Sequence, residues 1–448
     1  MKNRKNLIPV WGLLFLATAL FFTACQKREF MPDPEGEQVP YPDTVKSSLG
    51  DLMVKAAELK TFYAAWEKGS IKNIMQEKGT RARFTVFAPS DAAFQAKGLT
   101  VASIQAMSAA NVDSLLLLYV SMSDVKPVDL RDRSDNLMVK SLLPKPGVYV
   151  KYYDGNVPGT VSYDLYHHRY YLKIQGDELF ANGKKTGKLN YAPATNGGLY
   201  ILSSTIEKPT KTMLEVLEED GRFNLFVASQ RLTDRAFIET IAPELEPYLG
   251  YTPDDDEFMT SYAFYRSYYT KDWTFTRPIY EGYVGQNLVV STLFAPTDEA
   301  FRKVGFNTVE DIVNFNLTHG NARFDEEYFD IRGGYPMDTL YNYHRDFGRF
   351  FQRLSPGGDR AIQNATVFFS NDLGPRLNDY YVSLAGNVGP EYAYKMPLEF
   401  TVNSGRVQIK IKGSNAPAAT VIDGDILSLN GPIHVVDNLF VPKGFKFK

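Results

Sequence analysis

Few side chains in this 448-residue chain have the types and spacing of a reaction centre. His167 and His168 are adjacent and would point to opposite faces of a strand, so we do not expect both to bind one metal ion. The acidic run 254–257 lacks the spaced oxygen ligands of a calcium loop and is more typical of a solvated turn. Zinc-protease, serine-nucleophile and phosphate-loop patterns do not occur in the sequence, and no carboxylate pair for sugar hydrolysis can be named. We therefore expect no enzymatic activity, no metal site and no cofactor.

One densely aromatic segment, residues 258–283, is the best candidate for binding chemistry. Aromatic rings can stack on the apolar faces of sugar rings, and Arg266, Lys271 and Arg277 could bond hydroxyls or carboxylates. The same rings could instead form a small satellite core under a long loop. Both interpretations stay open, and the candidate binding residues in this segment are Tyr262, Tyr265, Tyr268, Trp273 and Tyr280.

Cys25 is the only cysteine, so it cannot form a disulfide within the chain. A basic start and an apolar run at Leu7–Phe22 precede it, which is typical of a signal peptide and short for a membrane span. The segment resembles a bacterial lipoprotein signal, although Phe22 stands where leucine is usual. That resemblance implies removal of residues 1–24 and attachment of fatty acyl chains such as palmitate to Cys25. The alternative is a plain cleaved signal peptide with an incidental cysteine.

Residues 25–43 are rich in proline and mildly acidic, which predicts an extended tether between the lipid and the first domain. Together with the lipid signal, the composition looks like that of a Bacteroidetes outer-membrane lipoprotein, either periplasmic or on the cell surface. A net charge of −3 offers no basic field for nucleic acid. The membrane, reached through the lipid anchor, is the first expected partner.

The segments that would position functional residues occur twice in the sequence. Thr85–Phe94 reads TVFAPSDAAF and Thr292–Phe301 reads TLFAPTDEAF, with seven of ten positions identical. Proline ends a strand, a hydroxyl residue (Ser90 or Thr297) caps the following helix, and acids occupy its first turn. The motif residues are Thr85, Phe87, Pro89, Asp91 and Phe94 in the first copy, and Thr292, Phe294, Pro296, Asp298 and Phe301 in the second.

A later pair of segments, Gly198–Pro209 and Gly431–Pro442, has glycine and proline at the same spacing. With both pairs in view, the chain resembles the fasciclin-like domain over about residues 46–443. The second copy matches the late stretch of the family at Gly431, His434, Asp437 and Pro442, whereas Leu199, Tyr200 and Ser203 replace Ile, His and Asp in the first.

The resemblance implies an α+β fold with two tandem fasciclin-like domains, each a small β-sheet wedge flanked by helices. We place the first domain at 44–208 and the second at 209–448, with insertions near 242–285 and 320–399. Apolar spacing predicts a helix over 48–68. Thr212 and Glu215 predict a capping box, and alternation predicts a strand pair over 400–412.

In the family, a tyrosine-histidine pair on the helix after the early motif is tied to cell adhesion and also packs inside the domain. The matching places are Tyr119-Val120 and Thr318-His319, so neither copy is expected to keep both residues. Tyr119 and His319 are candidates for binding or for packing, and His434 is expected to be a core histidine.

The resemblance of the N-terminus to a lipoprotein signal implies a cell-envelope lipoprotein. The resemblance to the fasciclin-like domain implies a non-catalytic adhesion or binding role. Its partners would be proteins or polysaccharides at the cell surface. One alternative is a glycan-binding accessory lipoprotein of a polysaccharide-uptake system. Another is a structural envelope protein that contacts other surface proteins.

Overall fold

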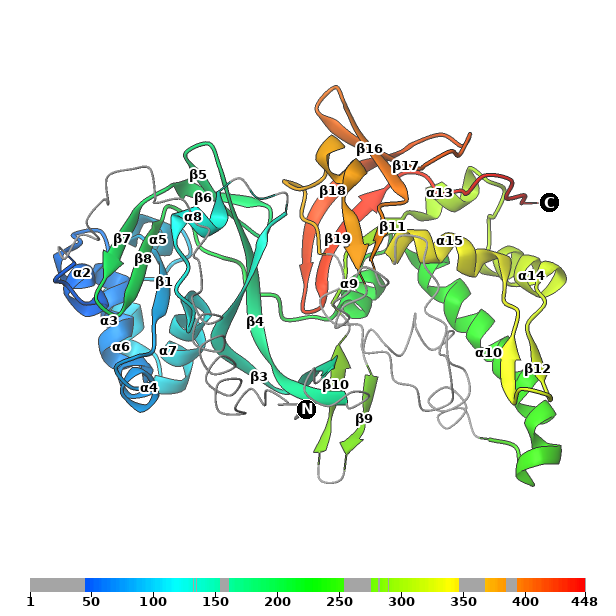
Figure 1. Ribbon diagram of the computed structural model, residues 1–448, viewed down its shortest axis with the longest axis horizontal. Coiled ribbons are helices and arrows are strands. Elements are labelled where there is room, and N and C mark those ends of the chain that lie inside the picture. Colours follow the sequence, from blue (N-terminus) through cyan, green and yellow to red (C-terminus); the bar gives the residue numbers. More distant parts are fainter. Residues whose placement is uncertain are drawn as a thin grey trace, which may run out of the picture. The chain divides into compact units, whose positions relative to one another are not determined.

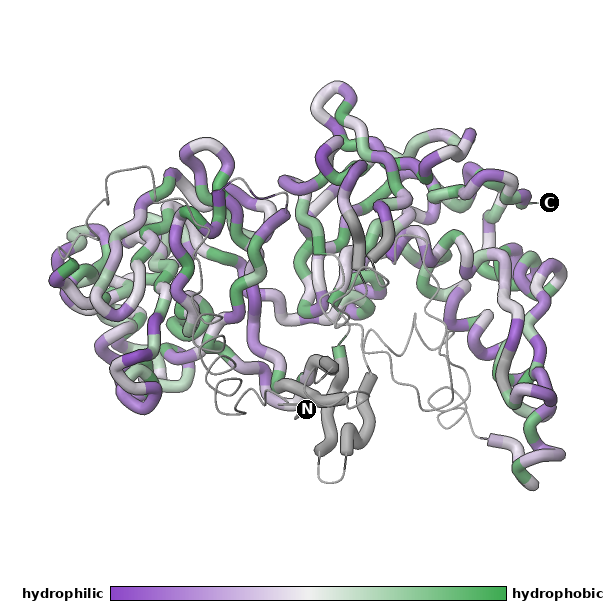
Figure 2. The backbone as a smooth tube through the Cα atoms, viewed as in Figure 1, coloured by the Kyte–Doolittle hydropathy of each residue, from purple (hydrophilic) through white to green (hydrophobic). Residues whose placement is uncertain are grey.

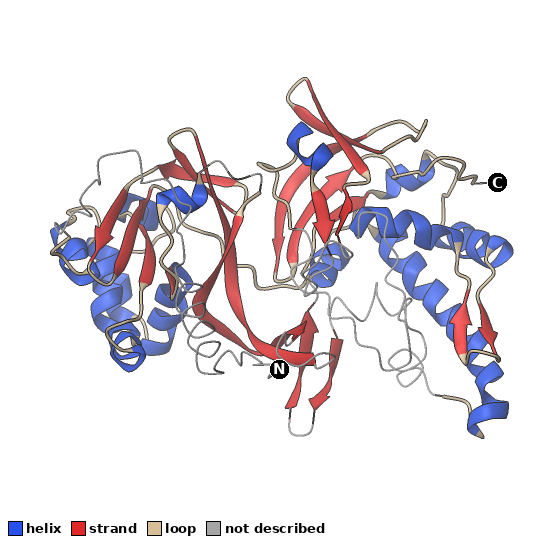
Figure 3. Ribbon diagram, viewed as in Figure 1, coloured by secondary structure: helices blue, strands red, loops and turns tan. Residues whose placement is uncertain are grey.

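A computed structural model describes residues 45–131, 133, 135–153, 161–253, 275–280, 283–288, 290–345, 367–383 and 393–447. Within these ranges the chain forms helices packed beside small sheets, which bears out the α+β expectation (Figure 3). The predicted signal peptide, Cys25 and the predicted tether at 25–43 all lie outside the described residues.

The first repeat combines short helices with a four-stranded sheet in the order β2-β1-β8-β7 (Figure 1). Its helices are α2 (Leu49–Lys55), α3 (Lys60–Lys68), α4 (Ile71–Lys78), α5 (Asp91–Gln95), α6 (Val101–Ala106), α7 (Ala109–Leu116), the 3-10 turn η1 (Leu117–Tyr119) and α8 (Pro127–Leu130). Its strands are β1 (Phe84–Pro89), β2 (Val120–Ser121), β3 (Leu137–Tyr153), β4 (Val161–Gln175), β5 (Glu178–Ala181), β6 (Lys184–Lys188), β7 (Tyr191–Ala194) and β8 (Gly197–Leu202).

The second repeat has a five-stranded sheet in the order β11-β19-β18-β17-β16. Its helices are α9 (Met213–Glu219), α10 (Asn224–Leu249), α13 (Asp298–Arg302), α14 (Val309–His319), α15 (Pro336–Arg345) and η3 (Pro375–Asp379). Its strands are β9 (Phe275–Tyr280), β10 (Tyr283–Leu288), β11 (Leu293–Pro296), β12 (Arg323–Asp325), β13 (Asp330–Arg332), β14 (Tyr381–Ser383), β15 (Ala393–Lys395), β16 (Leu398–Asn403), β17 (Arg406–Ile411), β18 (Ala419–Ser428) and β19 (Gly431–Val436).

The two repeats share a frame in which the early-motif strand lies parallel to the late-motif strand. Phe87 pairs with Tyr200 in β1·β8, and Phe294 pairs with His434 in β11·β19. This register aligns Gly197, not Gly198, with Gly431, so the glycine expected from the proline spacing is off by one residue. Both glycines have positive φ, and a Cβ there would lie 1.7 Å from the Phe84 oxygen or 1.9 Å from the Ser291 oxygen. The motif glycine is therefore required for the close approach of the two strands.

The early motif folds as its sequence predicts in both repeats. β1 ends at Pro89 and β11 at Pro296, and Ser90 and Thr297 cap the helices that follow. The motif acids do more than lie in a first turn, because their carboxylates bind the N-terminus of a neighbouring helix. Asp91 accepts bonds from the backbone nitrogens of Lys60 (3.2 Å) and Thr61 (2.7 Å), and Asp298 accepts one from Leu225 (2.7 Å).

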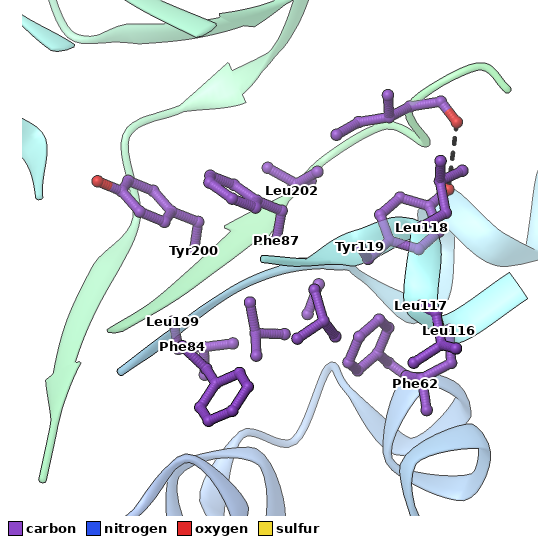
Figure 4. Close-up of a cluster of buried hydrophobic side chains, with 14 of the residues drawn as sticks. Phe62, Phe84, Phe87, Leu116, Leu117, Leu118, Tyr119, Leu199, Tyr200 and Leu202 are labelled. Atoms are coloured by element: carbon purple, nitrogen blue, oxygen red, sulfur yellow. Dashed lines mark hydrogen bonds between the residues drawn. The ribbon is translucent and has the colours of Figure 1, made fainter. Parts of the chain in front are cut away.

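The remaining motif residues are buried in the sheets and cores. Phe87, Phe94, Phe294 and Phe301 are fully buried. Thr85 accepts a bond from the Val125 nitrogen, and Thr292 accepts one from the Phe368 nitrogen. Figure 4 shows the first core, where Phe62, Phe84 and Phe87 lie among leucines from η1, α7 and β8. The motifs are accordingly folding elements.

The predicted helix over 48–68 needs correction. It is two helices, because the chain leaves helical geometry at Ala56 before α3 begins at Lys60. The second motif strand, β11, begins at Leu293, and Leu288 ends another strand, β10. β10 pairs with β3 and β9 in a six-stranded sheet ordered β6-β5-β4-β3-β10-β9, so strands from both halves of the sequence form one sheet.

The second repeat is enlarged within a helix as well as in loops. Helix α3 has 9 residues, whereas α10, capped by Asp298 in the same way, has 26 and continues past Ala242. Apolar and polar residues alternate along α10 (Figure 2), and its buried side chains include Phe237, Ile241 and Leu245. The predicted Thr212–Glu215 capping box and the strand pair over 400–412 are both present.

Candidate functional site

Tyr119, a predicted binding residue, is the last residue of η1 and is 2% exposed. Its ring packs against Phe62 and Phe94, with centroids 6.2 and 6.1 Å away. Its hydroxyl donates to the Ile206 carbonyl at 3.3 Å, as the dashed line in Figure 4 marks. Burial raises the pKa of Tyr119 well above the usual tyrosine value, so the phenol stays neutral.

The pair Thr318-His319 does not occupy the place of Tyr119-Val120 in the second repeat. His319 is exposed at the end of α14, where its ring lies 4.8 Å from that of Phe315. The ring equivalent to Tyr119 belongs to Tyr341 of α15, which packs against Phe226 and Phe301 at 5.2 and 6.3 Å. The predicted match at Thr318-His319 is wrong because the β12–β13 hairpin is inserted before α15.

A tyrosine-histidine dipeptide, Tyr343-His344, lies two residues beyond Tyr341 on α15. The Phe440 nitrogen donates to His344 Nε2 at 2.9 Å, so Nδ1 carries the proton and donates to the Phe294 carbonyl at 2.7 Å. The rings of His344 and Phe440 stack at 4.3 Å. Burial lowers the pKa of His344 to about 3, so the imidazole is neutral and structural. The dipeptide is visible in the sequence, but it lies two residues past the residue equivalent to Tyr119.

The late-motif residues of the second repeat also serve packing. His434 is fully buried, and its Nε2 lies 2.9 Å from the Phe368 carbonyl, which confirms the expected core histidine. Burial lowers its pKa. Asp437 accepts a 2.6 Å bond from the Thr420 nitrogen and so holds β18, and Pro442 follows in the terminal segment.

Other predicted sites fall outside the described residues or form no reaction centre. Cys25, the run 254–257 and the aromatic residues Tyr262, Tyr265, Tyr268 and Trp273 lie outside, and Tyr280 is described only as backbone in β9. His168 is buried and His167 is half-buried, as expected for neighbours on a strand. No group of His, Cys, Asp and Glu suited to a metal ion occurs among the residues with assigned positions.

A groove beside Tyr119, lined mainly by the first repeat, is a candidate site. It has a volume of about 750 Å³, within the range usual for ligand clefts. Helices α5–α7 and η1 form one side, and the β5–β6 hairpin with residues 204–208 forms the other. The apolar lining includes Phe94, Leu99, Met107, Leu115, Leu118, Tyr119 and Ile206 of the first repeat and Leu427 of β18 in the second.

Lysines border this apolar lining. Lys97, Lys184, Lys185 and Lys208 all line the groove and are exposed. Lys184 pairs with Glu207 at 2.9 Å, Lys185 pairs with Glu178 at 2.7 Å, and Lys208 donates to Ser114 at 3.0 Å. Four lysines against two glutamates leave the groove positively charged. The arrangement suits an anionic partner that also carries apolar groups.

Sequence reasoning missed this groove because its lysines come from separate segments. Of the candidate binding residues chosen from the sequence, only Tyr119 lines the groove, where it forms part of the floor. Lys184 and Lys185 begin β6, directly after the two-residue turn Asn182-Gly183.

None of the described helices is long and apolar enough to cross a membrane. Residues 57–208 match the family model of the fasciclin domain. Among solved structures, a FAS1 domain pair from the insect cell adhesion molecule Fasciclin I is 14% identical, over 86% of this chain and 96% of that chain, with a TM-score of 0.27. No curated protein gives a significant match. Residues 57–208 therefore form a fasciclin domain, and the second repeat uses the same strand frame.

Proposed function

We propose that this protein is a non-catalytic binding protein of the bacterial envelope, anchored through acylated Cys25. In this proposal its first fasciclin domain holds an acidic segment of a partner protein in the lysine-bordered groove. Fasciclin domains are associated with cell adhesion and binding. The observation that carries the proposal is the excess of positive charge around an apolar floor.

The two parts of the groove would contribute differently to binding. Salt bridges at an exposed rim stabilise by about 0.2–1 kcal/mol each, so the lysines mainly orient and attract the partner. Burial of apolar side chains on the floor, at roughly 25 cal/mol per Å², supplies most of the affinity. Binding should therefore start faster at low salt and should persist in part at high salt.

Charge reversal at the rim tests the groove. We expect Lys97→Glu with Lys208→Glu to reduce adhesion of beads coated with the mature protein to cells at least tenfold at low salt. The matched control is Lys46→Glu with Lys78→Glu, two exposed lysines of the same repeat that do not line the groove. Equal adhesion by both variants would reject the groove as the contact site.

The anchor is tested separately. Cys25→Ser should abolish incorporation of labelled palmitate and move the protein from the outer-membrane fraction to the soluble fraction. A Cys25→Ser protein that stays in the membrane fraction would refute the lipid anchor without bearing on the groove.

A further inference from the structure

We propose that a cluster of exposed aromatic residues in the second repeat binds the sugar rings of a neutral polysaccharide. The cluster, called here the aromatic end, consists of Tyr248, Tyr251, Phe324, Tyr328 and Phe329. It lies where the end of α10 meets the β12–β13 hairpin (Figure 1). Both segments are additions that the first repeat lacks, and the proposal does not depend on the lysine-bordered groove.

The aromatic end collects the exposed rings of the structure. Across the residues whose side chains are described, the exposed aromatic side chains are Tyr248, Tyr251, Tyr328 and Phe329, and Tyr328 reaches 58% exposure. In a chain with 28 tyrosines and 30 phenylalanines, packing alone would scatter exposed rings over several elements. Their concentration at one place indicates a contact surface.

Three of the rings hold one another in fixed orientations. The centroids of Tyr248 and Phe324 are 5.3 Å apart, those of Phe324 and Phe329 are 5.3 Å apart, and those of Tyr248 and Phe329 are 5.9 Å apart. Phe324 is half-buried and adjoins the core of α10, where Phe237 and Leu245 lie. The outer rings are thus supported from below, which lowers the entropy lost when a ligand binds.

The backbone at Phe329 is strained in a way that folding alone does not explain. Its φ is +47°, in the left-handed region where bulky residues are rare, at the last position of a four-residue hairpin loop. Glycine or asparagine at this position would avoid a cost of about 1 kcal/mol. Instead the chain places a large apolar ring there and leaves it 37% exposed. Strain retained at an exposed ring is typical of binding sites.

The charges around the aromatic end select against anionic ligands. Asp325, Glu326 and Glu327 outnumber Arg323 and Arg332 in the hairpin. Arg332 pairs with Asp325 at 3.2 Å and lies 4.0 Å from the centre of the Tyr328 ring, so its charge is already engaged. An acidic polymer would therefore be repelled, in contrast to the groove of the first repeat.

Sugar rings fit the remaining chemistry better than a protein surface does. A pyranose presents a flat face of C–H groups that packs against an aromatic ring, and its hydroxyls can donate to carboxylates such as Glu327. A protein partner would require a larger apolar area than these few rings supply. A chain of neutral sugars can contact the rings in sequence without being enclosed.

The test measures retention of the full mature protein in gels containing neutral polysaccharides: starch, xylan, galactomannan, mixed-linkage β-glucan and dextran. Phe329→Gly is the central variant, because glycine relieves the positive φ and the fold should persist. We expect Phe329→Gly and Tyr328→Ala each to weaken binding of the retained polysaccharide at least tenfold. Tyr328→Phe, which keeps the ring, should bind within threefold of the unmodified protein.

Val128→Ala is the matched control, since Val128 is an exposed apolar residue of the first repeat. Retention that is lost in Phe329→Gly, kept in Val128→Ala and insensitive to salt supports the proposal. Failure to bind every polysaccharide in the set overturns it, as does equal binding by Phe329→Gly. A Phe329→Gly variant that still binds the polysaccharide but no longer binds a protein partner would also overturn it. Since Lys97→Glu with Lys208→Glu should leave retention unchanged, failure of this proposal and failure of the groove proposal can be told apart.

Discussion

The two repeats build the same strand frame but fill one of its interior positions with different polar residues. Tyr200 of the first repeat and His434 of the second hold the same register position and are both fully buried. The second repeat has a further buried histidine, His344, which accepts a hydrogen bond from the Phe440 nitrogen. The first repeat thus has a phenol where the second has the His434 imidazole, and the second adds His344 beside its frame.

The difference matters because phenols and imidazoles charge in different pH ranges. A tyrosine stays neutral at physiological pH in both the folded and the unfolded chain. A histidine exposed in the unfolded chain takes up a proton below about pH 6.5. His344 and His434 are neutral in the folded protein, since burial lowers the pKa of both. Acid should therefore lower the stability of the shared frame in the second repeat but not in the first.

The largest expected effect tests what the repeats have in common. Gly197→Ala and Gly431→Ala should each destabilise their own repeat by roughly 3 kcal/mol or more, because the new Cβ meets a backbone oxygen. Hydrogen exchange resolved by peptide should show faster exchange in the substituted repeat. Gly98→Ala is the control, with positive φ but open space around it, and should cost about 1 kcal/mol. Similar costs at all three glycines would contradict a shared close approach of strands.

We expect acid to lower the stability of the second repeat more than that of the first. The unfolded chain binds protons at His344 below about pH 6.5, but the folded protein does not until about pH 3, so stability present above pH 6.5 falls as the pH falls. At pH 5 the loss from His344 is about 2 kcal/mol, and His434 adds to it. In the first repeat, burial lowers the pKa of His168 on β4 to about 4, but this residue lies outside the shared frame.

The measurement is urea unfolding at pH 7 and pH 5, followed in each repeat by hydrogen exchange. His344→Gln should reduce the difference between the two pH values in the second repeat, whatever its cost at pH 7. His168→Gln should reduce the smaller difference in the first. An unchanged pH dependence in His344→Gln would show that its imidazole is charged in the folded protein.

The duplicated frame was predictable from the sequence, since proline, cap residue, acid and phenylalanine act locally at fixed spacing. Residues that depend on insertions were not. The match to Tyr119-Val120 was expected at Thr318-His319, whereas the inserted hairpin moves the ring equivalent to Tyr119 to Tyr341. The break between α2 and α3 at Ala56 could not be predicted, because the sequence has no helix-breaking residue there.

Binding surfaces were harder still, because they join segments that are distant in the sequence. Lys97, Lys184 and Lys208 meet only when the β5–β6 hairpin lies across from α5 and α7. The aromatic end needs both an unusually long α10 and a phenylalanine with positive φ, and no local pattern predicts either. The binding segment predicted from the sequence, residues 258–283, is a different one and stays a prediction.

A smaller effect should distinguish the two helix contacts made by the motif acids. Asp91 accepts bonds from two backbone nitrogens and Asp298 from one, so Asp91→Asn should cost about 2 kcal/mol and Asp298→Asn about 1 kcal/mol. Urea unfolding at pH 7 provides the values. Glu299→Gln, an exposed acid of the same first turn, should cost no more than about 0.5 kcal/mol. A larger cost for Asp298→Asn than for Asp91→Asn would refute the count of bonds as the cause.

The smallest expected effect is a gain in stability in the second repeat. The β5–β6 turn has Asn182-Gly183 and the β16–β17 turn has Ser404-Gly405, with positive φ at all four residues. Asn-Gly suits such two-residue turns better than Ser-Gly, because asparagine tolerates the left-handed region. Ser404→Asn should therefore stabilise the second repeat by about 0.5 kcal/mol in urea unfolding. Ser123→Asn, at an exposed position without positive φ, should change stability by less. An equal gain at both positions would mean that the turn geometry is not the cause.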